Sequence, residues 1–407
     1  MIELQLTGMA YGGEAFGRDD DGRMVFVPFT LPGERARVRI LESHKRWARA
    51  YPAEMLETAA LRIEPRCMHF EQCGGCHYQH IPYDHQLRFK QEIVIDQLRR
   101  IGGFEDPPVN ETIRAPSRWN YRNHVRFHRT GAGDPAFYDY TGSELFSVKE
   151  CHLPESRLDL VRRELDETKF PEPVRQIGLR CGTDDPSMII LHASGKPVVE
   201  TIVERPLSIV WQNEQDEYVL SGDRLLHFDI DGRSFQVSAE SFFQVNTPLI
   251  PELVGLALTE LAPRAGERII DLYAGVGLFS RFIAEKGVDL LGVEAEPAAC
   301  ADFLVNLEGC EDVELWAMSV EQALAQVEIQ PDAVLLDPPR TGLSHGAFDE
   351  LMRLAPDRIL YVSCDPATLA RDGKKLTASG YRLQSLTPID MFPQTYHIET
   401  VSNWLAS

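Results

Sequence analysis

Cys364 stands at the end of an apolar stretch, where an α/β enzyme often carries its reactive groups. The residues ILYVSCDPATLARD (359–372) predict a short strand, a turn at Asp365 and Pro366, and then a helix. A thiol just before a helix start can be stabilised as a thiolate by the free backbone N–H groups there. From position alone, Cys364 is either a nucleophile or a buried structural thiol.

A glycine turn follows an earlier predicted strand. RIIDLYAGVGLFS (268–280) places Asp271 at the strand end, and Gly275 and Gly277 let a ligand approach the backbone closely. About 20 residues on, LLGVEAE ends at Glu294, and an acid at such a position can bind both hydroxyls of a ribose. The turn lacks a full G-x-G-x-x-G and has no phosphate-binding Lys, which favours S-adenosylmethionine over NAD or ATP.

Two further segments carry acids that are suited to chemistry. In VLLDPPRTGL (334–343), Asp337 follows a strand, and the two prolines stiffen the loop after it. An acid before Pro-Pro at this place is typical of methyltransferases that act on planar nitrogens or bases, although it also serves as a simple strand stop. Near the C-terminus, FPQTYHIETV offers His397 and Glu399, and a carboxylate in a closed pocket can act as a base.

Four cysteines form a candidate metal site in the first part of the chain. They are Cys67, Cys73 and Cys76 in CMHFEQCGGCHYQH, and Cys151 in SVKECHLP. Four thiolates can hold a [4Fe–4S] cluster. Zinc usually prefers two C-x2-C knuckles, and only one such pair is present; zinc and no metal are the alternatives. Cys181, Cys300 and Cys310 are interpreted as ordinary, partly buried thiols.

The elements that position these residues fall into three regions. Residues 1–58 alternate as short strands separated by turns, which predicts an OB-like barrel. Residues 59–235 contain the cysteines, an amphipathic helix over 83–103 and then short strands, which predicts a central β-rich domain. Residues 236–407 alternate strand and helix, which predicts a mostly parallel, doubly wound sheet. The fold class is therefore α/β.

Charge and composition limit the possible partners. The net charge of the 407-residue chain is −21, yet residues 1–130 have 19 Lys or Arg against 17 Asp or Glu. If RNA is bound, this first third must make most phosphate contacts. Candidates are Lys45 and Arg46 beside Trp47, together with the arginines of RWNYRNHVRFHR: Arg118, Arg122, Arg126 and Arg129. A charged solvent-facing surface is the alternative for both. Neither an apolar span nor a secretory signal is found, so we expect a cytoplasmic monomer that does not contact membranes.

Four motifs together resemble the RNA uracil-5-methyltransferase family: DLYAGVGLFS, LLDPPRTGL, YVSCDPATLARD and FPQTYHIETV. The resemblance covers roughly residues 235–407 and implies a Rossmann-like class I methyltransferase domain that makes 5-methyluridine from S-adenosylmethionine. It implies that Cys364 adds to C6 of the uracil and that Glu399 removes the C5 proton. Asp337 would lie at the target base and the cofactor.

Further positions match the family outside these motifs. SFFQVN (241–246) implies that Gln244 binds the cofactor and that Phe242 packs near a flipped uracil. Tyr273 and Glu294 match cofactor-contacting positions, and Gly275 lies in the same turn. The chain departs from the family at three positions near the expected adenine: Leu278, Met318 and Ser319.

The resemblance also addresses the cysteines and the RNA. The cysteine pattern resembles the iron–sulfur members of the family, and the first 58 residues resemble a TRAM domain, an RNA-binding module. Together they imply the branch that acts on 23S ribosomal RNA, with transfer RNA as the alternative. A radical S-adenosylmethionine enzyme is disfavoured because four ligands leave no free iron site. A non-catalytic iron–sulfur RNA-binding protein is disfavoured by the presence of Cys364, Glu399 and Gln244.

Overall fold

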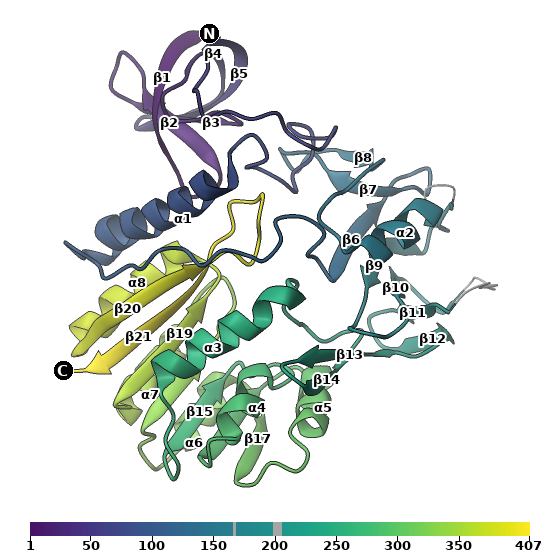
Figure 1. Cartoon of the computed structure of the whole chain (residues 1–407), viewed down its shortest axis with the longest axis vertical. Coiled ribbons are helices and arrows are strands. Elements are labelled where there is room, and N and C mark those ends of the chain that lie inside the picture. Colours follow the sequence, from purple (N-terminus) through teal and green to yellow (C-terminus); the bar gives the residue numbers. More distant parts are fainter. Residues whose placement is uncertain (166–167, 198–205) are drawn as a thin grey trace.

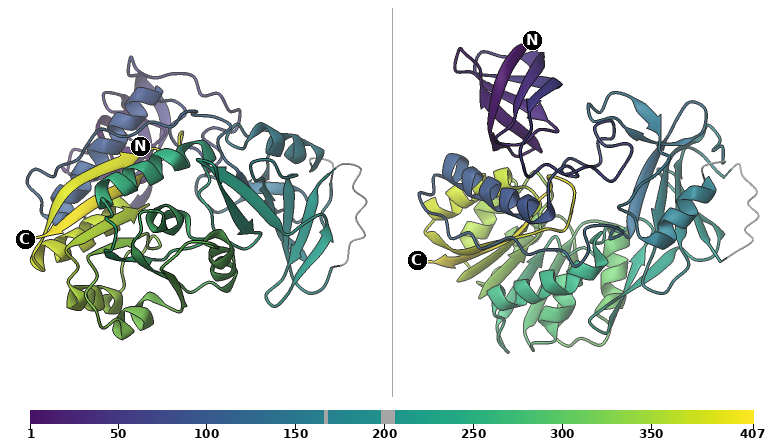
Figure 2. Two further views of the ribbon diagram at one scale, coloured as in Figure 1. Left: turned by 60° about the horizontal axis from the view of Figure 1, so that its bottom comes forward. Right: turned by 45° about the horizontal axis from the view of Figure 1, so that its top comes forward.

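The computed structural model describes residues 1–165, 168–197 and 206–407. A small barrel, a central sheet and a larger α/β sheet follow one another in space, and the N-terminal barrel stands apart at one end (Figures 1 and 2). Helix α1 lies between the barrel and the C-terminal strands.

The barrel closes on itself in the strand order β1-β2-β3-β5-β4. Its strands are β1 (Ile2–Met9), β2 (Glu14–Arg18), β3 (Met24–Pro28), β4 (Arg35–Ser43) and β5 (Trp47–Glu57). Leu4 and Leu6 of β1 are buried while Glu3 and Gln5 are exposed, because side chains alternate across a strand. The predicted barrel is confirmed.

The central sheet has seven strands in the order β12-β11-β10-β9-β6-β7-β8. Helix α2 (Ser156–Leu165) shares a hydrophobic core with one face of it, where Phe127 and Trp211 are fully buried. The strands are β6 (His124–Arg129), β7 (Pro135–Tyr138), β8 (Leu145–Ser147), β9 (Val174–Arg180), β10 (Met188–Ala193), β11 (Ser208–Gln212) and β12 (Glu217–Ser221). The hairpin of β13 (Leu225–Ile230) and β14 (Arg233–Ser238) joins this region to the C-terminal core.

The C-terminal sheet has the order β17-β16-β15-β18-β19-β21-β20. Strands β17, β16, β15, β18 and β19 pair in parallel with one another, and β21 pairs antiparallel with both β19 and β20. The strands are β15 (Arg268–Leu272), β16 (Asp289–Glu294), β17 (Val313–Ala317), β18 (Ala333–Leu336), β19 (Arg358–Ser363), β20 (Tyr381–Ile389) and β21 (Glu399–Ala406). The predicted doubly wound α/β sheet is confirmed.

Each face of this sheet has its own apolar core. Ile269 and Leu335 point into one core, and their chain neighbours Ile270 and Leu336 point into the other. The first core includes residues of α3 (Ile250–Leu261), α4 (Leu278–Ala284) and α5 (Pro297–Asn306), with a short turn η2 (Thr247–Leu249) leading into α3. The second includes residues of α6 (Val320–Gln326), α7 (His345–Leu354) and α8 (Pro366–Ala378).

Helix α1 (Tyr83–Gln97) belongs to the second core as well. It continues as one π-helical turn, η1 (Leu98–Gly102), and ends at Gly103, whose φ is 79°. The predicted helix over 83–103 is therefore present, with its last turn widened. Its residues Ile93 and Val94 pack with the second core, and residues 107–113 run beside β20. Part of the predicted central domain thus supports the C-terminal sheet.

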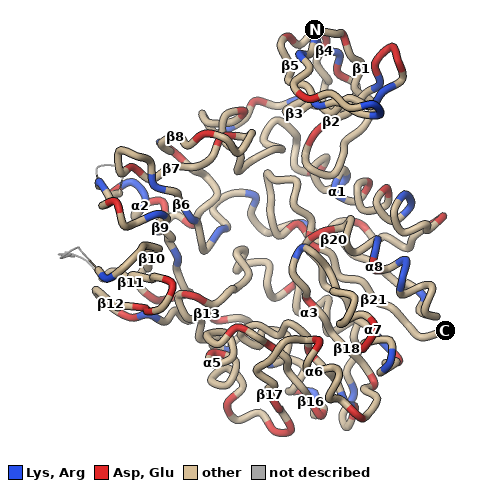
Figure 3. The backbone as a smooth tube through the Cα atoms, turned by 180° about the vertical axis from the view of Figure 1, so that it is seen from behind, with Lys and Arg blue, Asp and Glu red and all other residues tan. Residues whose placement is uncertain are grey.

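No helix within the described ranges is long and apolar enough to cross a membrane. The charges are unevenly placed, as Figure 3 shows: Asp and Glu predominate around α5, α6 and β17, whereas Lys and Arg occur on β6, β9 and α2. Acidic residues thus gather on this part of the C-terminal domain.

Candidate active site

The carboxyl ends of the parallel strands gather most of the predicted site. Asp337 follows β18 and Cys364 follows β19, and Glu399 is the first residue of the antiparallel β21. Ser363 pairs with Thr400 across β19 and β21. Because the two strands are antiparallel, Cys364, which follows Ser363, and Glu399, which precedes Thr400, lie at the same edge of the sheet. An antiparallel strand begins where its parallel neighbours end, which is how a C-terminal residue meets this edge.

The thiol of Cys364 lies among negative groups. Burial, followed by the charges of Glu399 and Asp337, raises its pKa to about 12, while Arg340 acts in the opposite direction. The neutral thiol is therefore favoured in the free protein. A positive charge bound in this site would stabilise the thiolate.

The acids of the site share one electrostatic environment. Burial and the nearby Asp271 raise the pKa of Asp337 to about 7, and burial raises that of Asp271 to about 7 even though Ser280 Oγ donates to it at 2.5 Å. The other oxygen of Asp271, Oδ1, is buried without a partner. Burial and then Asp337 raise the pKa of Glu399 well above its usual range. Such acids favour a cationic ligand.

The glycine turn after β15 is hydrogen-bonded to Glu294. The backbone N–H of Gly275 donates to Glu294 Oε2 at 2.8 Å, and Gly275 has a φ of 55° with open space on its Cβ side. Oε1 accepts from Ala295 N at 2.7 Å and from Glu296 N at 2.8 Å. Tyr273 also has a positive φ, 61°, which is unusual for a tyrosine and marks a constrained backbone.

The two predicted site residues of the SFFQVN segment, Phe242 and Gln244, differ in their exposure to solvent. Phe242 is 69% exposed, which leaves its ring available to a base. Gln244 is buried, and its carbonyl accepts from Asn123 Nδ2 at 2.8 Å. The backbone of Gln244 is thus bonded to the central domain, whereas the side chain of Phe242 is exposed to solvent.

The barrel contributes a residue that sequence reasoning missed. Tyr11, in the turn between β1 and β2, donates its hydroxyl to Asp365 Oδ2 at 2.9 Å, one residue after Cys364. Its ring also packs edge-on against Tyr396, with centroids 5.9 Å apart. Nothing in the spacing of the motifs signals this contact, which joins the barrel to the loop that carries Cys364.

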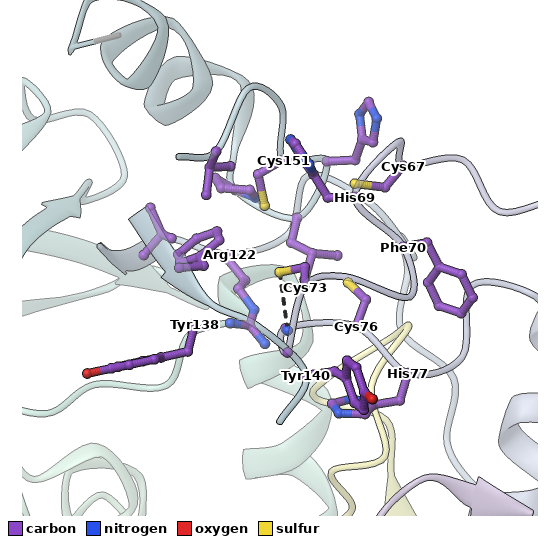
Figure 4. A pocket seen from close by; sticks show the side chains of 18 of the residues that line it. Cys67, His69, Phe70, Cys73, Cys76, His77, Arg122, Tyr138, Tyr140 and Cys151 are labelled. Atoms are coloured by element: carbon purple, nitrogen blue, oxygen red, sulfur yellow. Dashed lines mark hydrogen bonds between the residues drawn. The ribbon is translucent and has the colours of Figure 1, made fainter. Parts of the chain in front are cut away.

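The four predicted cysteine ligands line one cavity of about 680 Å³ (Figure 4). Burial raises the pKa of Cys67 and Cys73 to about 11 and that of Cys76 to about 12, and the charge of Cys151 adds to each shift. Residues far apart in sequence thus share one site. Within the described ranges, however, no group of three or more His, Cys, Asp or Glu side chains could hold a single metal ion.

Arg122 lies in the same cavity, although the sequence predicted it on the RNA path (Figure 4). Its charge acts to lower the pKa of Cys73, Cys76 and Cys151. The structure therefore turns Arg122 inward, toward the thiols. Arg126 on β6 is exposed, as are Lys45 and Arg46 at the tip between β4 and β5. There His44 stacks on Trp47 with ring centroids 4.1 Å apart.

The order of the sheet, with an antiparallel strand beside β19, and the polar groups at its carboxyl edge define a class I methyltransferase. Comparison with known proteins makes the class more specific. Residues 207–405 match the family described as tRNA (Uracil-5-)-methyltransferase, and residues 1–52 match the TRAM domain. This chain belongs to the RNA uracil-5-methyltransferase family, and it is an RNA methyltransferase with a TRAM domain.

Relatives match along almost the whole chain. An uncharacterized RNA methyltransferase of Thermosynechococcus vestitus is 31% identical over 98% of this chain and 97% of its own length. One from Nostoc sp. is 32% identical over 99% and 95%. The solved tRNA (uracil-54, C5)-methyltransferase of Pyrococcus abyssi, in complex with S-adenosyl-L-homocysteine, is 25% identical, covers 99% of this chain and 100% of its own, and has a TM-score of 0.74.

Proposed function

We propose that this protein methylates C5 of a uridine in 23S ribosomal RNA, with S-adenosylmethionine as methyl donor and through a covalent bond from Cys364 to C6. The observation that carries the proposal is the register of β19 and β21, which brings a thiol and a buried carboxyl to one edge. The raised pKa of Glu399 suits a general base, because a weaker acid is a stronger proton acceptor once ionised.

The carboxyl edge fits the proposed cofactor. When bound, S-adenosylmethionine supplies an electrophilic methyl group on a positively charged sulfur. Asp271 is a buried acid and Asp337 a half-buried one, and such a charge would favour the ionised form of both. The Gly275 turn leaves room for close backbone approach, and the acid of Glu294 matches a ribose-binding position. Gln244 and Tyr273 complete the proposed set.

The proposed reaction uses one thiol and one base. The thiolate of Cys364 adds to C6, and the electron pair of the C5–C6 double bond moves onto the C4 carbonyl oxygen as an enolate. C5 would then attack the methyl carbon of the bound donor, while the methyl–sulfur bond breaks and its electron pair stays on the sulfur, which leaves as a neutral thioether. The carboxylate of Glu399 removes the C5 proton, the C5–C6 double bond reforms, and Cys364 leaves as a thiolate. Asp337 contacts the base and the cofactor, and the exposed ring of Phe242 packs on the extruded uracil.

The RNA is proposed to cross the barrel, the central sheet and the carboxyl edge. Lys45 and Arg46 extend from the barrel tip, and Arg126 is exposed on β6. The combination of the TRAM barrel and the cysteine site resembles the ribosomal branch, which supports 23S RNA. Transfer RNA is the second candidate, because the Pyrococcus abyssi enzyme that matches 99% of this chain is a transfer RNA methyltransferase.

Methyl-labelled S-adenosylmethionine separates the two candidates. We expect label in 5-methyluridine from unmodified 23S ribosomal RNA and none from unmodified transfer RNA, as measured by nucleoside analysis. Label in transfer RNA alone would contradict the ribosomal assignment and leave the chemistry in place. No label in either RNA would overturn the proposed activity. The matched control is Cys364→Ala, which should remove any label found.

We also propose that Cys67, Cys73, Cys76 and Cys151 hold a [4Fe–4S] cluster. Their shared cavity supports this, because four partly buried thiols that line one space could all serve as thiolate ligands once a bound metal deprotonates them. Arg122 in the same cavity offsets part of the negative charge. The cluster is proposed as structural, and no reaction step is assigned to it.

Protein purified without oxygen is expected to contain about four iron and four inorganic sulfide per chain. Replacing Cys76 by serine should lower both the iron and sulfide contents and the melting temperature, because one of the four proposed ligands is lost. Cys310→Ser, outside the cavity, should leave iron and stability as they are. A fully active protein free of iron and sulfide would contradict the cluster, and one zinc per chain would favour the alternative metal.

A further inference from the structure

The segment that delivers Glu399 has no regular structure, although it is largely buried. It covers residues 390–398 between β20 and β21, and Asp390, Met391 and Thr395 in it are fully buried. Helix and sheet bonds do not satisfy such a backbone, so other groups must fix its course. The position of the end of this segment therefore sets the position of Glu399, the next residue.

Lys90 of α1 contacts both ends of the segment. Its Nζ lies 2.5 Å from Asp390 Oδ1, 3.1 Å from the carbonyl of Phe392 and 2.8 Å from the carbonyl of His397. The three donors of the ammonium group are thereby all used. His397 is two residues before Glu399, so the last of these bonds lies next to the proposed base. Both Lys90 and Asp390 are completely buried.

Other contacts hold the middle of the segment. Gln86, one turn earlier on α1, exchanges two hydrogen bonds of 3.1 Å with Gln394. The hydroxyl of Tyr121 donates to the carbonyl of Pro393 at 3.0 Å, and Asn246 Nδ2 donates to that of Met391 at 3.1 Å. At His397, near the end of the segment, Lys90 binds the backbone carbonyl, while Arg340 lies 3.4 Å from the ring atom Nδ1 and the backbone N–H donates to Thr395 Oγ1 at 3.3 Å.

Stability alone does not account for a buried lysine here. A buried ion pair is often no more stabilising than apolar side chains of similar volume. Here Asp390 Oδ2 also has no partner, so the pair is incompletely satisfied. The feature that an apolar pair would lack is the donation to two backbone carbonyls. Those two bonds fix the distance between the start and the end of the segment.

We propose that Lys90 is a positioning residue for the base: by binding Asp390, Phe392 and His397 together, it sets the location of the Glu399 carboxyl relative to Cys364. This inference rests on the proposed function and deepens it. Because Glu399 acts after Cys364 has added, the geometry that Lys90 controls is needed for elimination and is not needed for addition. A displacement of about 1 Å is enough to slow a step by about 10²-fold.

The test uses the double variant Lys90→Met/Asp390→Leu. Both charges are removed together, so no uncompensated charge is buried, while the carbonyls of Phe392 and His397 lose their donor. With unmodified RNA, we expect product formation to slow by about 10²-fold and a denaturant-stable protein–RNA adduct, carrying the methylated base, to accumulate. Capture of 5-fluorouridine RNA should keep the wild-type rate, because that capture requires no proton removal. Arg88→Met, an exposed position on the same helix, is the matched control and should behave as wild type.

Three results would overturn the inference. One is unchanged turnover in the double variant. The second is slow turnover without accumulated adduct, and the third is loss of 5-fluorouridine capture. Either of these last two results would mean that the addition of Cys364 to C6 is damaged as well. The proposed function is tested separately by the wild-type protein in the same assay: if it forms no 5-methyluridine, both the function and this inference fail. If it does and the variant matches it, only this inference fails.

Discussion

Replacing Cys364 by alanine is expected to abolish methyl transfer, with a loss of at least about 10⁴-fold in single-turnover rate. Without the thiol, C6 is not attacked and C5 stays too weak a nucleophile for the methyl donor. The wild-type protein should form a denaturant-stable adduct with 5-fluorouridine RNA, because C5 then has no proton to lose, and the variant should form none. Gel mobility under denaturing conditions measures both.

Cys310→Ala is the matched control for this experiment, since Cys310 is half-buried outside the carboxyl edge. It should retain both turnover and adduct. Residual turnover in Cys364→Ala within tenfold of wild type would show that the thiol is structural. The fold should tolerate the change, because Cys364 is partly exposed and its side chain is small.

Replacing Glu399 by glutamine is expected to stop the reaction after the addition of Cys364 and the methyl transfer, at the removal of the C5 proton. Proton removal slows by about 10²- to 10⁴-fold, the range typical of a lost general base. Addition by Cys364 should persist, because a neutral glutamine removes one of the negative charges that raise the pKa of the thiol. Ordinary uridine RNA should therefore stay covalently attached with its methyl group in place, which mass spectrometry of the adduct detects.

The pH dependence of the wild-type rate should report the same group. Glu399 must be ionised to accept a proton, and its pKa lies well above the usual range through burial and Asp337. A turnover rate limited by elimination should therefore rise as the pH rises toward that pKa. In the Glu399→Gln variant, this rise of the turnover rate with pH should disappear. Glu350→Gln, which changes a half-buried carboxyl on α7 that pairs with Arg353, should keep the wild-type profile. A Glu399→Gln variant with normal turnover and no adduct would contradict the role of base.

The sequence alone determined the local elements and most of the carboxyl edge. Alternating apolar residues predicted the barrel strands, and the strand–helix alternation after residue 236 predicted the doubly wound sheet. Because parallel strands end at one edge, Asp337 and Cys364 were predicted to meet there with the glycine turn. These features depend on short-range patterns that each segment carries by itself. The cluster and the target RNA were predicted by resemblance and stay predictions.

Only the tertiary structure decided how distant segments meet. β21 enters the sheet antiparallel between β19 and β20, which places Glu399 beside Cys364. Lys90 meets Asp390 across 300 residues, and Tyr11 meets Asp365 across 354. On α1, the apolar residues Leu87 and Ile95 are only half-buried, whereas the polar residues Gln86 and Lys90 are buried. The periodicity of a helix identifies its apolar face, but it does not identify the polar residue of another segment that contacts the helix. Such pairings depend on packing between elements, and no local pattern encodes them.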